Sequence, residues 1–443
     1  MSLKKNSEEI KSQMDCPKAE TVCDINKEHE DNEKIDLDAP EDKFQLIFIL
    51  FFLLGLFHFL PWSFFTTATE FWMYKFRNTS IEETNSEFRT ELQAQFNATL
   101  KVTLQISDVT FLILTLFFGR YVKVRTRMIG VLCIILSLFA LITVFVKVDT
   151  DSWQTEFFVL VMAITAGINA TNAVFTITMY TTLAHFPHHY LAAYLMGSAL
   201  AGIFTSSLQI LSLSLQMSVQ NSALVYFGIG FCTIASALVL LLATSRNKFY
   251  VYYMGKVKDD RNEKMISLRE TIRLGRKIWS SVVLLGLYLL TLDASPTALV
   301  VSEGEGNGPW NDEYFIPTIT YFLAAVCSLI GRGLSFKFVP KWGGIHWTIV
   351  ITLRLIIFVP LFMLSNAQPR HHLPVLLPHD YQYIILIIMF HLSGGYLLNR
   401  CSYNITNLVT KEELKKAYHV NMICGGLQMA ALSFVSIVSV KLL

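Results

Sequence analysis

The stretch FQLIFILFFLLGLFHFLPWSFFT, residues 44–66, decides the fold class because it is long enough and apolar enough to cross a bilayer. A helix needs about 20 mostly apolar residues to cross the hydrocarbon layer, where only its own backbone bonds satisfy the peptide groups. The polar segment before this stretch lacks the features of a signal peptide. We therefore expect residues 44–66 to be retained as the first span of an integral membrane protein.

Further stretches along the chain have the same character and predict about eleven transmembrane helices in all. The expected spans are 44–66, 103–121, 129–147, 157–184, 188–217, 222–244, 278–301, 314–339, 345–366, 380–402 and 417–441. Composition agrees with this class, since 53% of the 443 residues are hydrophobic and only 16% are charged. The expected fold is therefore all-α and polytopic.

Polar segments divide the chain into its expected parts. Residues 1–43 are rich in charged residues and poor in large apolar ones, which predicts a disordered cytosolic arm. Residues 245–277 are basic and separate the sixth span from the seventh, which predicts a cytosolic linker. We therefore expect an N-terminal bundle over 44–244, with a first external loop over 70–102, and a C-terminal bundle over 278–443.

Lysine and arginine gather in alternate connections, and connections of that kind usually lie in the cytosol. Besides the linker, the connections rich in basic residues contain Arg120, Lys123, Arg125, Arg127, Lys337, Lys341, Lys411, Lys415 and Lys416. An odd number of spans then places the N-terminus in the cytosol and the C-terminus outside. Glycosylation sequons at Asn78 and Asn97 fall in the first external loop, which agrees with this orientation and favours the plasma membrane.

Motifs for covalent chemistry are missing from the sequence. It has no GxxxxGK[ST] phosphate loop, no HExxH zinc motif and no GxSxG nucleophile motif. The seven cysteines lack the spacing of a zinc site, and a formal charge of +2 indicates no nucleic-acid partner. We therefore predict no catalytic residue, no metal and no cofactor. Two bundles joined by a linker favour a carrier over an enzyme.

Ionisable side chains inside the spans are candidates for function, because an unpaired charge in hydrocarbon is costly. They are Asp108, Asp293, Arg332, Arg354, His391 and Arg400. Arg332 lies between two glycines that leave room for a neighbouring backbone or a ligand, so we expect it to face a cavity. Asp293 lies on the preceding span at a similar expected depth and is the candidate ion-pair partner of Arg332. A position near the membrane interface, where long side chains reach the headgroups, is the alternative for Arg354 and Arg400, and it is favoured for Arg400.

Four motifs occur in order along the chain. They are LPWSFFTTAT at 60–69, YFIP at 314–317 followed by GRGL at 331–334, Arg354-Leu355 with FVPL at 358–361, and SGGYL at 393–397. Together they resemble the LPWNFFxTAT, YFIP…DxxGR, RxxFxPL and SNGYL motifs of the equilibrative nucleoside transporter family (solute carrier family 29). The resemblance covers the chain from about residue 44 to its C-terminus.

The resemblance implies a fold similar to the major facilitator architecture, with about eleven helices in a six-plus-five arrangement around a central cavity. It also implies facilitated diffusion by alternating access between two bundles. The family's binding residues, carried over by position, fall on Trp62, Thr176, Ser328 and Arg332. The family's outer gate falls on Thr66, Pro296 and Tyr321.

Four positions depart from the family pattern, and the first is Ser63, which stands where the family has Asn. Ser328 stands where the family has Asp, Thr176 where it has Gln, and Gly394 where it has Asn. Ser328 lacks the charge that would neutralise Arg332. The expected binding set is Trp62 for stacking on a base, with Thr66, Asn172, Thr176, Ser328 and Arg332 for hydrogen bonds to sugar or base.

These patterns favour a facilitative nucleoside or nucleobase transporter, whose partners are a small-molecule cargo and the lipid bilayer. A carrier of the same fold for another polar or cationic solute is an alternative, and it predicts that Asp293 lines the cavity away from Arg332. A membrane receptor or scaffold that has lost transport is a third reading, and it predicts a cavity too tight or too apolar for polar cargo. Proton coupling through Asp108 or Asp293 also stays open.

Overall fold

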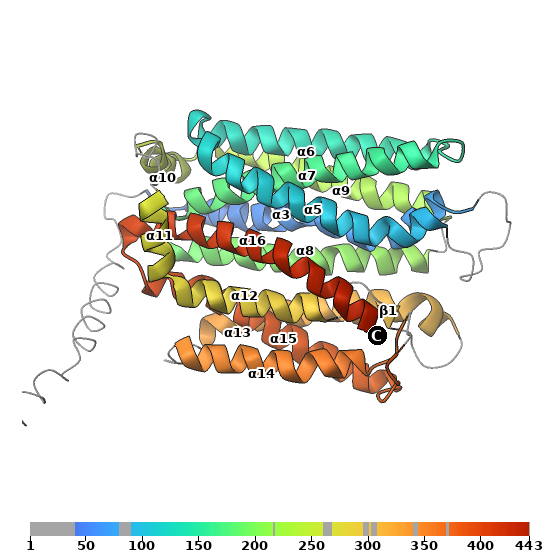
Figure 1. The fold of residues 1–443 in the computed structure, drawn as a ribbon. Helices are drawn as coiled ribbons and strands as arrows, with labels where there is room; N and C mark the ends of the chain where they lie inside the picture. The colour runs from blue at the N-terminus through green and yellow to red at the C-terminus, as the bar shows by residue number, and fades with distance from the viewer. Residues whose placement is uncertain are drawn as a thin grey trace, which may run out of the picture. The chain divides into compact units, whose positions relative to one another are not determined.

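The computed structural model describes residues 40–78, 90–215, 218–259, 268–295, 301–302, 308–338, 340, 344–368 and 372–442. Nearly all of the predicted N-terminal arm, residues 1–43, lies outside these ranges, so the account below concerns the compact unit Lys43–Leu443. Long helices dominate this unit and run lengthwise beside one another (Figure 1). A short antiparallel pair, β1 (Val301–Ser302) with β2 (Ala367–Gln368), joins two of the connections.

The first group of long helices comes from the first half of the chain. Its members are α3 (Leu46–Thr67), α5 (Glu91–Phe118), α6 (Val124–Lys147), α7 (Gln154–Leu183), α8 (His188–Ser214) and α9 (Val219–Thr244). Shorter elements accompany them: η1 (Lys43–Gln45), α4 (Thr69–Lys75) and η3 (Gly119–Tyr121). Within this group α3 packs on α8, α5 on α7, and α6 on both α7 and α9.

The second group follows a pair of connecting helices, α10 (Lys248–Asp259) and α11 (Leu268–Lys277). Its members are α12 (Trp279–Ala294), η6 (Trp310–Tyr314), η7 (Ile316–Leu323), α13 (Ala324–Lys337), α14 (Gly344–Met363), α15 (Asp380–Asn404), η8 (Ile405–Asn407) and α16 (Lys411–Leu442). Within this group α13 packs on α15, and α12 packs on α14, α15 and α16. We call the end of the unit that carries α10 and α11 the linker end, and the end that carries β1 the strand end (Figure 1).

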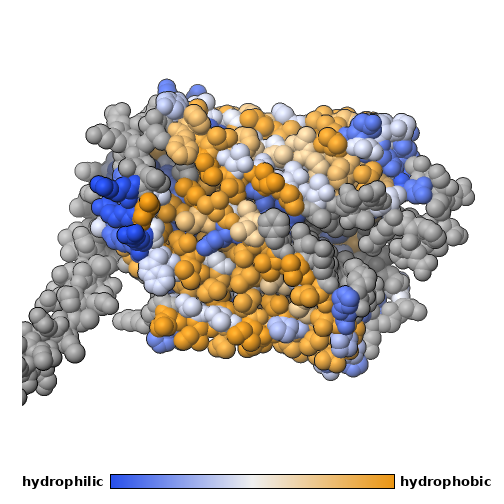
Figure 2. Space-filling model, viewed as in Figure 1, coloured by the Kyte–Doolittle hydropathy of each residue, from blue (hydrophilic) through white to orange (hydrophobic). Residues whose placement is uncertain are grey.

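Within the described residues, eight helices are long and apolar enough to cross a membrane, or nine if the α11–α12 pair, bent by 73°, counts as one span. Side chains that face outward on these helices are apolar, as Val144, Val239 and Ile356 illustrate with exposed fractions of 62%, 65% and 62%. On the face that Figure 2 shows, hydrophobic residues predominate along the middle and hydrophilic ones gather toward the ends. Such a surface is unfavourable in water and suits lipid. The chain is therefore a multi-pass membrane protein.

The predicted spans coincide with long helices, but some ends differ. Helix α5 begins at Glu91 rather than near residue 103, because Thr90 and Gln93 form a reciprocal cap at its N-terminus. Hydropathy does not detect this polar first turn. The predicted external loop over 70–102 is consequently shorter, and Asn97 lies on α5 rather than in a loop, whereas Asn78 follows α4 and is exposed.

Glycines let helices approach each other closely at the centre of each group. A Cβ atom placed on Gly55 of α3 would overlap the Tyr194 carbonyl of α8, and one placed on Gly197 of α8 would overlap the Phe52 carbonyl of α3. The absence of side chains at these positions lets the two backbones pack against each other directly. The α3–α8 pair therefore depends on Gly55 and Gly197.

Glycines also bring two helix backbones into direct contact in the second group. A Cβ atom on Gly331 of α13 would overlap the Leu392 carbonyl of α15, and one on Gly395 of α15 would overlap the Ser328 carbonyl of α13. Contacts between the two groups run along two seams, where α8 lies against η7 and α13, and α5 lies against α16. Each group thus has a closely packed centre, and α8 and α13 meet from opposite sides of one seam.

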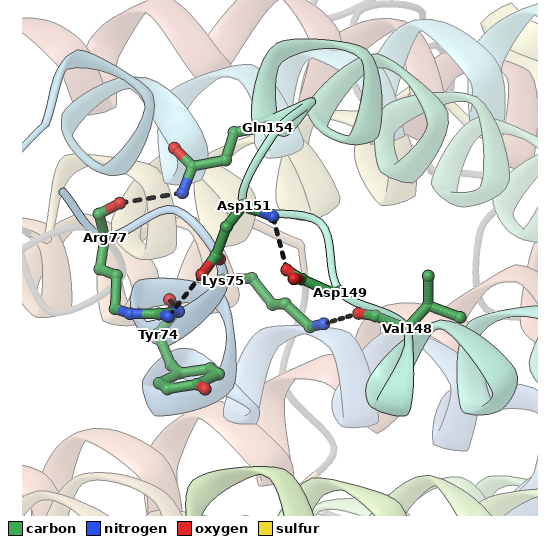
Figure 3. Close-up of polar contacts among 7 residues, drawn as sticks. All are labelled: Tyr74, Lys75, Arg77, Val148, Asp149, Asp151 and Gln154. Carbon is green, nitrogen blue, oxygen red and sulfur yellow. Dashed lines mark hydrogen bonds and ion pairs between the residues drawn. The ribbon is translucent and has the colours of Figure 1, made fainter. Parts of the chain in front are cut away.

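Polar contacts fasten the strand end of the first group (Figure 3). Lys75 is 2% exposed and donates to the Val148 carbonyl at 2.7 Å, and Arg77 pairs with Asp151 at 2.8 Å. Gln154 donates to the Arg77 carbonyl at 2.9 Å. Burial lowers the pKa of Lys75, and the charge of Asp151 opposes that shift. These contacts tie the end of α4 to the connection between α6 and α7.

We predict that Gly197→Ala destabilises the folded protein, because the added methyl group must displace the α3 backbone. Overpacking of this kind costs about 1–3 kcal/mol. The midpoint of thermal unfolding in detergent should therefore fall. Gly228→Ala on α9 is the matched control, since a Cβ atom there meets nothing within 4 Å. An equal midpoint for both variants would show that the α3–α8 contact is not close.

Candidate functional site

Arg332 joins the two groups of helices near the linker end. It precedes Lys337, the last residue of α13, by about 8 Å of helix. Its Nη1 donates hydrogen bonds to the Leu195 carbonyl at 3.0 Å and to Ser198 Oγ at 2.7 Å. Both acceptors lie on α8 in the first group, so this side chain crosses the seam between the groups.

The charge of Arg332 is held by neutral groups. Within the part of the chain that the structure describes, no carboxylate contacts it. Its Nε is buried without a hydrogen-bond partner, and Tyr180 of α7 and Tyr288 of α12 lie within electrostatic range of the guanidinium. Because hydrogen bonds to neutral oxygens are weaker than those to an anion, these partners can be exchanged for others at low cost.

The predicted pairing of Asp293 with Arg332 is wrong in this structure. Asp293 of α12 forms an ion pair with Lys101 of α5 at 2.9 Å. Helix α12 runs from the linker end, and Asp293 lies about 21 Å along it, whereas Arg332 lies about 8 Å from that end. The expected span over 278–301 placed Asp293 too near mid-membrane, because the helix ends at Ala294.

His58 is a buried site residue that the sequence analysis missed. It lies on α3, is 6% exposed, and uses both ring nitrogens. Nδ1 lies 2.6 Å from the Tyr194 hydroxyl, and Nε2 lies 2.7 Å from Thr176 Oγ1. The one signal in the sequence is a histidine within the otherwise apolar run four residues before Trp62.

The hydrogen bonds of His58 have a defined direction. Thr176 Oγ1 also donates its only proton to the Asn172 carbonyl at 2.9 Å. The hydroxyl can therefore only accept from His58, so the hydrogen lies on Nε2 of His58. The neutral ring then accepts the Tyr194 proton at Nδ1. This arrangement satisfies every contact at once and fixes α3, α7 and α8 to one another.

Tyr194 connects His58 to the neighbourhood of Arg332. Its ring stacks on His58 with centroids 5.8 Å apart and meets Tyr180 edge-on at 6.0 Å. The next residue along α8, Leu195, supplies the carbonyl that Arg332 contacts. We call His58, Thr176, Tyr180, Tyr194 and Arg332 the central polar cluster. It brings Thr176 and Arg332, which the sequence predicted, together with three residues that it did not.

Two further predicted site residues lie beside this cluster. Asn172 precedes Thr176 by one turn of α7, and its side-chain Oδ1 is buried without a hydrogen-bond partner. Ser328 precedes Arg332 by one turn of α13 and is half-buried. Asn172 therefore offers an unused acceptor, and Ser328 offers a hydroxyl on the turn that carries the guanidinium.

The other predicted positions are described only in part. Trp62 and Thr66 lie in the last turns of α3, but their side chains are outside the described part of the chain, as is Pro296 altogether. Tyr321 lies in η7, a π-helical segment, within electrostatic range of Tyr383 on α15. Wide helical turns of this type often accompany functional sites.

Arg354 is buried, which contradicts the interfacial alternative that the sequence had left open for it. It is 4% exposed, donates to Thr291 Oγ1 and to the Phe390 carbonyl, the latter at 3.0 Å, and lies over the Phe390 ring at 4.0 Å from its centroid. A Cβ atom on Gly394 would lie 2.9 Å from Arg354 Nη2. Glycine at position 394 therefore leaves room for this guanidinium.

Comparison with known proteins gives one consistent result. The protein family described as "Nucleoside transporter" matches residues 162–282 and 258–435. Equilibrative nucleoside transporter 1 of Rattus norvegicus is 28% identical over 449 residues, which cover 89% of this chain and 97% of that protein. Equilibrative nucleoside transporter 2 of Homo sapiens is 30% identical over 413 residues, which cover 82% of this chain and 90% of that protein.

We predict that His58→Phe lowers the midpoint of thermal unfolding, because it leaves the Tyr194 hydroxyl and Thr176 without their partner. Each buried polar group orphaned in this way costs about 1–3 kcal/mol. A double-mutant cycle with Tyr194→Phe tests the link, since Tyr194→Phe should cost much less in the His58→Phe background than in the wild type. Losses that simply add in the double variant would contradict the hydrogen bond.

Proposed function

We propose that this protein, which belongs to the equilibrative nucleoside transporter family, carries nucleosides or nucleobases down their gradients by alternating access between two helical bundles. The observation that carries the proposal is the Arg332 guanidinium, which bonds across the seam to Leu195 and Ser198 of the opposite group. A buried charge with exchangeable neutral partners at a seam suits a cavity that opens and closes. The reaction is translocation and involves no covalent chemistry.

The proposed architecture has eleven spans in a six-plus-five arrangement. Helices α5 and α16 join the nine apolar spans, because each is long enough to cross and runs between the two groups. Their lower apolarity fits this position, since Lys101 of α5 meets Asp293 across the seam instead of facing lipid. The parts proposed with it are a cytosolic arm over 1–43, bundles over 44–244 and 278–443, and a linker over 245–277.

The proposed orientation places the linker end in the cytosol and the strand end outside. Exposed basic residues at the linker end include Arg269, Arg273 and Lys277 of α11, in line with the usual distribution of positive charge. The N-terminus is then cytosolic and the C-terminus extracellular. Asn78, exposed after α4, is the favoured glycosylation site on the outer face, and the plasma membrane is the proposed location.

Contacts across the seams define the proposed transport cycle. Near the linker end, Arg332 bonds to α8, Thr181 of α7 bonds to His419 of α16 at 3.0 Å, and Tyr180 packs on Tyr418. Toward the strand end, Lys101 pairs with Asp293. Opening toward the cytosol breaks the first set, and opening toward the outside breaks the ion pair. Both sets are polar and can be remade.

The proposed binding set keeps the residues expected from sequence. It comprises Trp62, Thr66, Asn172, Thr176, Ser328 and Arg332, with Pro296 and Tyr321 as the outer gate. Its support is the unused acceptor of Asn172 and the partnerless Nε of Arg332, because a polar cargo offers both a donor and an acceptor. The alternative of a cationic cargo loses its main support, since the Asp293 carboxylate is neutralised by Lys101.

Uptake of labelled uridine, adenosine and adenine into cells that express the chain tests the proposal directly. A facilitative carrier equilibrates the cargo across the membrane, and an imposed pH gradient leaves the final level unchanged. Accumulation that follows the pH gradient would indicate proton coupling. A chain that reaches the cell surface but moves none of the three solutes would support the receptor or scaffold reading.

We predict that Arg332→Ala abolishes uridine uptake while surface expression persists, because it removes the charged donor at the seam. Lys337→Ala is the matched control, since Lys337 is an exposed cation on the same helix and should be dispensable. Surface biotinylation measures expression for both variants. Wild-type uptake by Arg332→Ala would remove this residue from the site.

A further inference from the structure

We propose that Asp108 binds the ribose hydroxyls of the cargo and supplies the carboxylate that α13 lacks at Ser328. The inference rests on the proposed function and adds a binding residue on the opposite bundle. Asp108 lies on helix α5, which carries none of the family motifs and no member of the central polar cluster.

One face of α5 is turned toward the second group of helices. Lys101, Gln105, Asp108 and Leu112 follow one another at helical spacing and so share this face. Lys101 reaches Asp293 on α12, and Leu112 packs with Ala173 of α7 and Met422 of α16 in one apolar cluster. Asp108 lies between these two contacts, on the face of α5 that is turned toward the second group.

Asp108 has no protein partner among the described residues. No hydrogen bond or ion pair engages its carboxylate, and the residue is partly buried. The nearest cation on its face, Lys101, lies about 10 Å away along the helix axis and is already paired. An unpaired carboxylate in the middle of a span is costly unless water or a ligand reaches it.

Neighbouring amides add unused acceptors at the same depth. Oε1 of Gln105, on the same face of α5, is buried without a partner, and so are Oδ1 of Asn172 and Oδ1 of Asn421. Asn172 and Asn421 adjoin the residues of α7 and α16 that pack on Leu112. The region therefore offers several acceptors with no donor bonded to them, which is the complement of a donor-rich ligand.

Ribose is the part of a nucleoside that matches this set. Each ribose hydroxyl can rotate its proton toward an acceptor, whereas the edge of a base holds fixed acceptors among its donors. A carboxylate accepts two hydroxyls at once with charge-assisted bonds. Arg332, near the linker end, then remains available for acceptor groups of the cargo. A carboxylate on α5 thus replaces the one that the family carries on α13, and the charge lies on the opposite side of the seam from Arg332.

The test compares uridine with 2′,3′-dideoxyuridine, which lacks the two ring hydroxyls, in the wild type and in Asp108→Asn. We expect Asp108→Asn to raise the KM for uridine about tenfold, because a charge-assisted hydrogen bond is about twice as strong as a neutral one. The maximal rate and the KM for dideoxyuridine should change little. Thr110→Ala, an exposed position on the outer face of α5, is the control and should match the wild type.

Thermal stability separates a binding role from a structural one. Asparagine has the shape of aspartate without the uncompensated charge, so Asp108→Asn should hold or raise the midpoint of unfolding. An unchanged uridine KM, or an equal change for both cargoes, would overturn the role of Asp108. A lowered midpoint would point to a structural carboxylate instead. If the wild type transports neither cargo, the proposed function is wrong, and this inference, which rests on it, is wrong as well.

Discussion

A guanidinium in the membrane interior must keep hydrogen-bond partners, and Arg332 finds them on the opposite side of a helix seam. The Leu195 carbonyl and Ser198 Oγ belong to α8, while Arg332 belongs to α13. Any separation of these two helices removes both acceptors together, and the charge must then find water or cargo. The contact between the two groups near the linker end, and the proposed cycle, depend on this requirement.

The rigidity of each bundle makes the seam the natural place for motion. Gly55 and Gly197 bring α3 and α8 into backbone contact, and Gly331 and Gly395 do the same for α13 and α15. Helices packed this closely move as units, so relative motion concentrates where contacts are polar and exchangeable. Lys101–Asp293 toward the strand end and Arg332 toward the linker end are two such contacts, on either side of the region where Asp108 and Asn172 have unused acceptors.

The sequence predicted the helices and drew attention to Arg332, but it did not predict the hydrogen-bond partners of Arg332. The length of an apolar stretch locates a span, because the thickness of the bilayer sets the length of helix that crosses it. The two glycines beside Arg332 indicated that a backbone or a ligand lies close to it. Partners depend on the depth at which helices end, and the early end of α12 at Ala294 moved Asp293 away from Arg332. His58 was missed and the burial of Arg354 was not predicted for a related reason, since only tertiary packing reveals that both side chains are buried and hydrogen-bonded.

The central claim is that the Arg332 contact closes the linker end and must break during transport. Spin labels at Lys123 and Phe338, both exposed at that end of α6 and α13, measure the separation of the bundles by double electron–electron resonance in a variant without other reactive cysteines. The account predicts that uridine populates a second, longer distance and that Arg332→Ala populates it without cargo. A single distance, unchanged by uridine and by Arg332→Ala, would contradict the account.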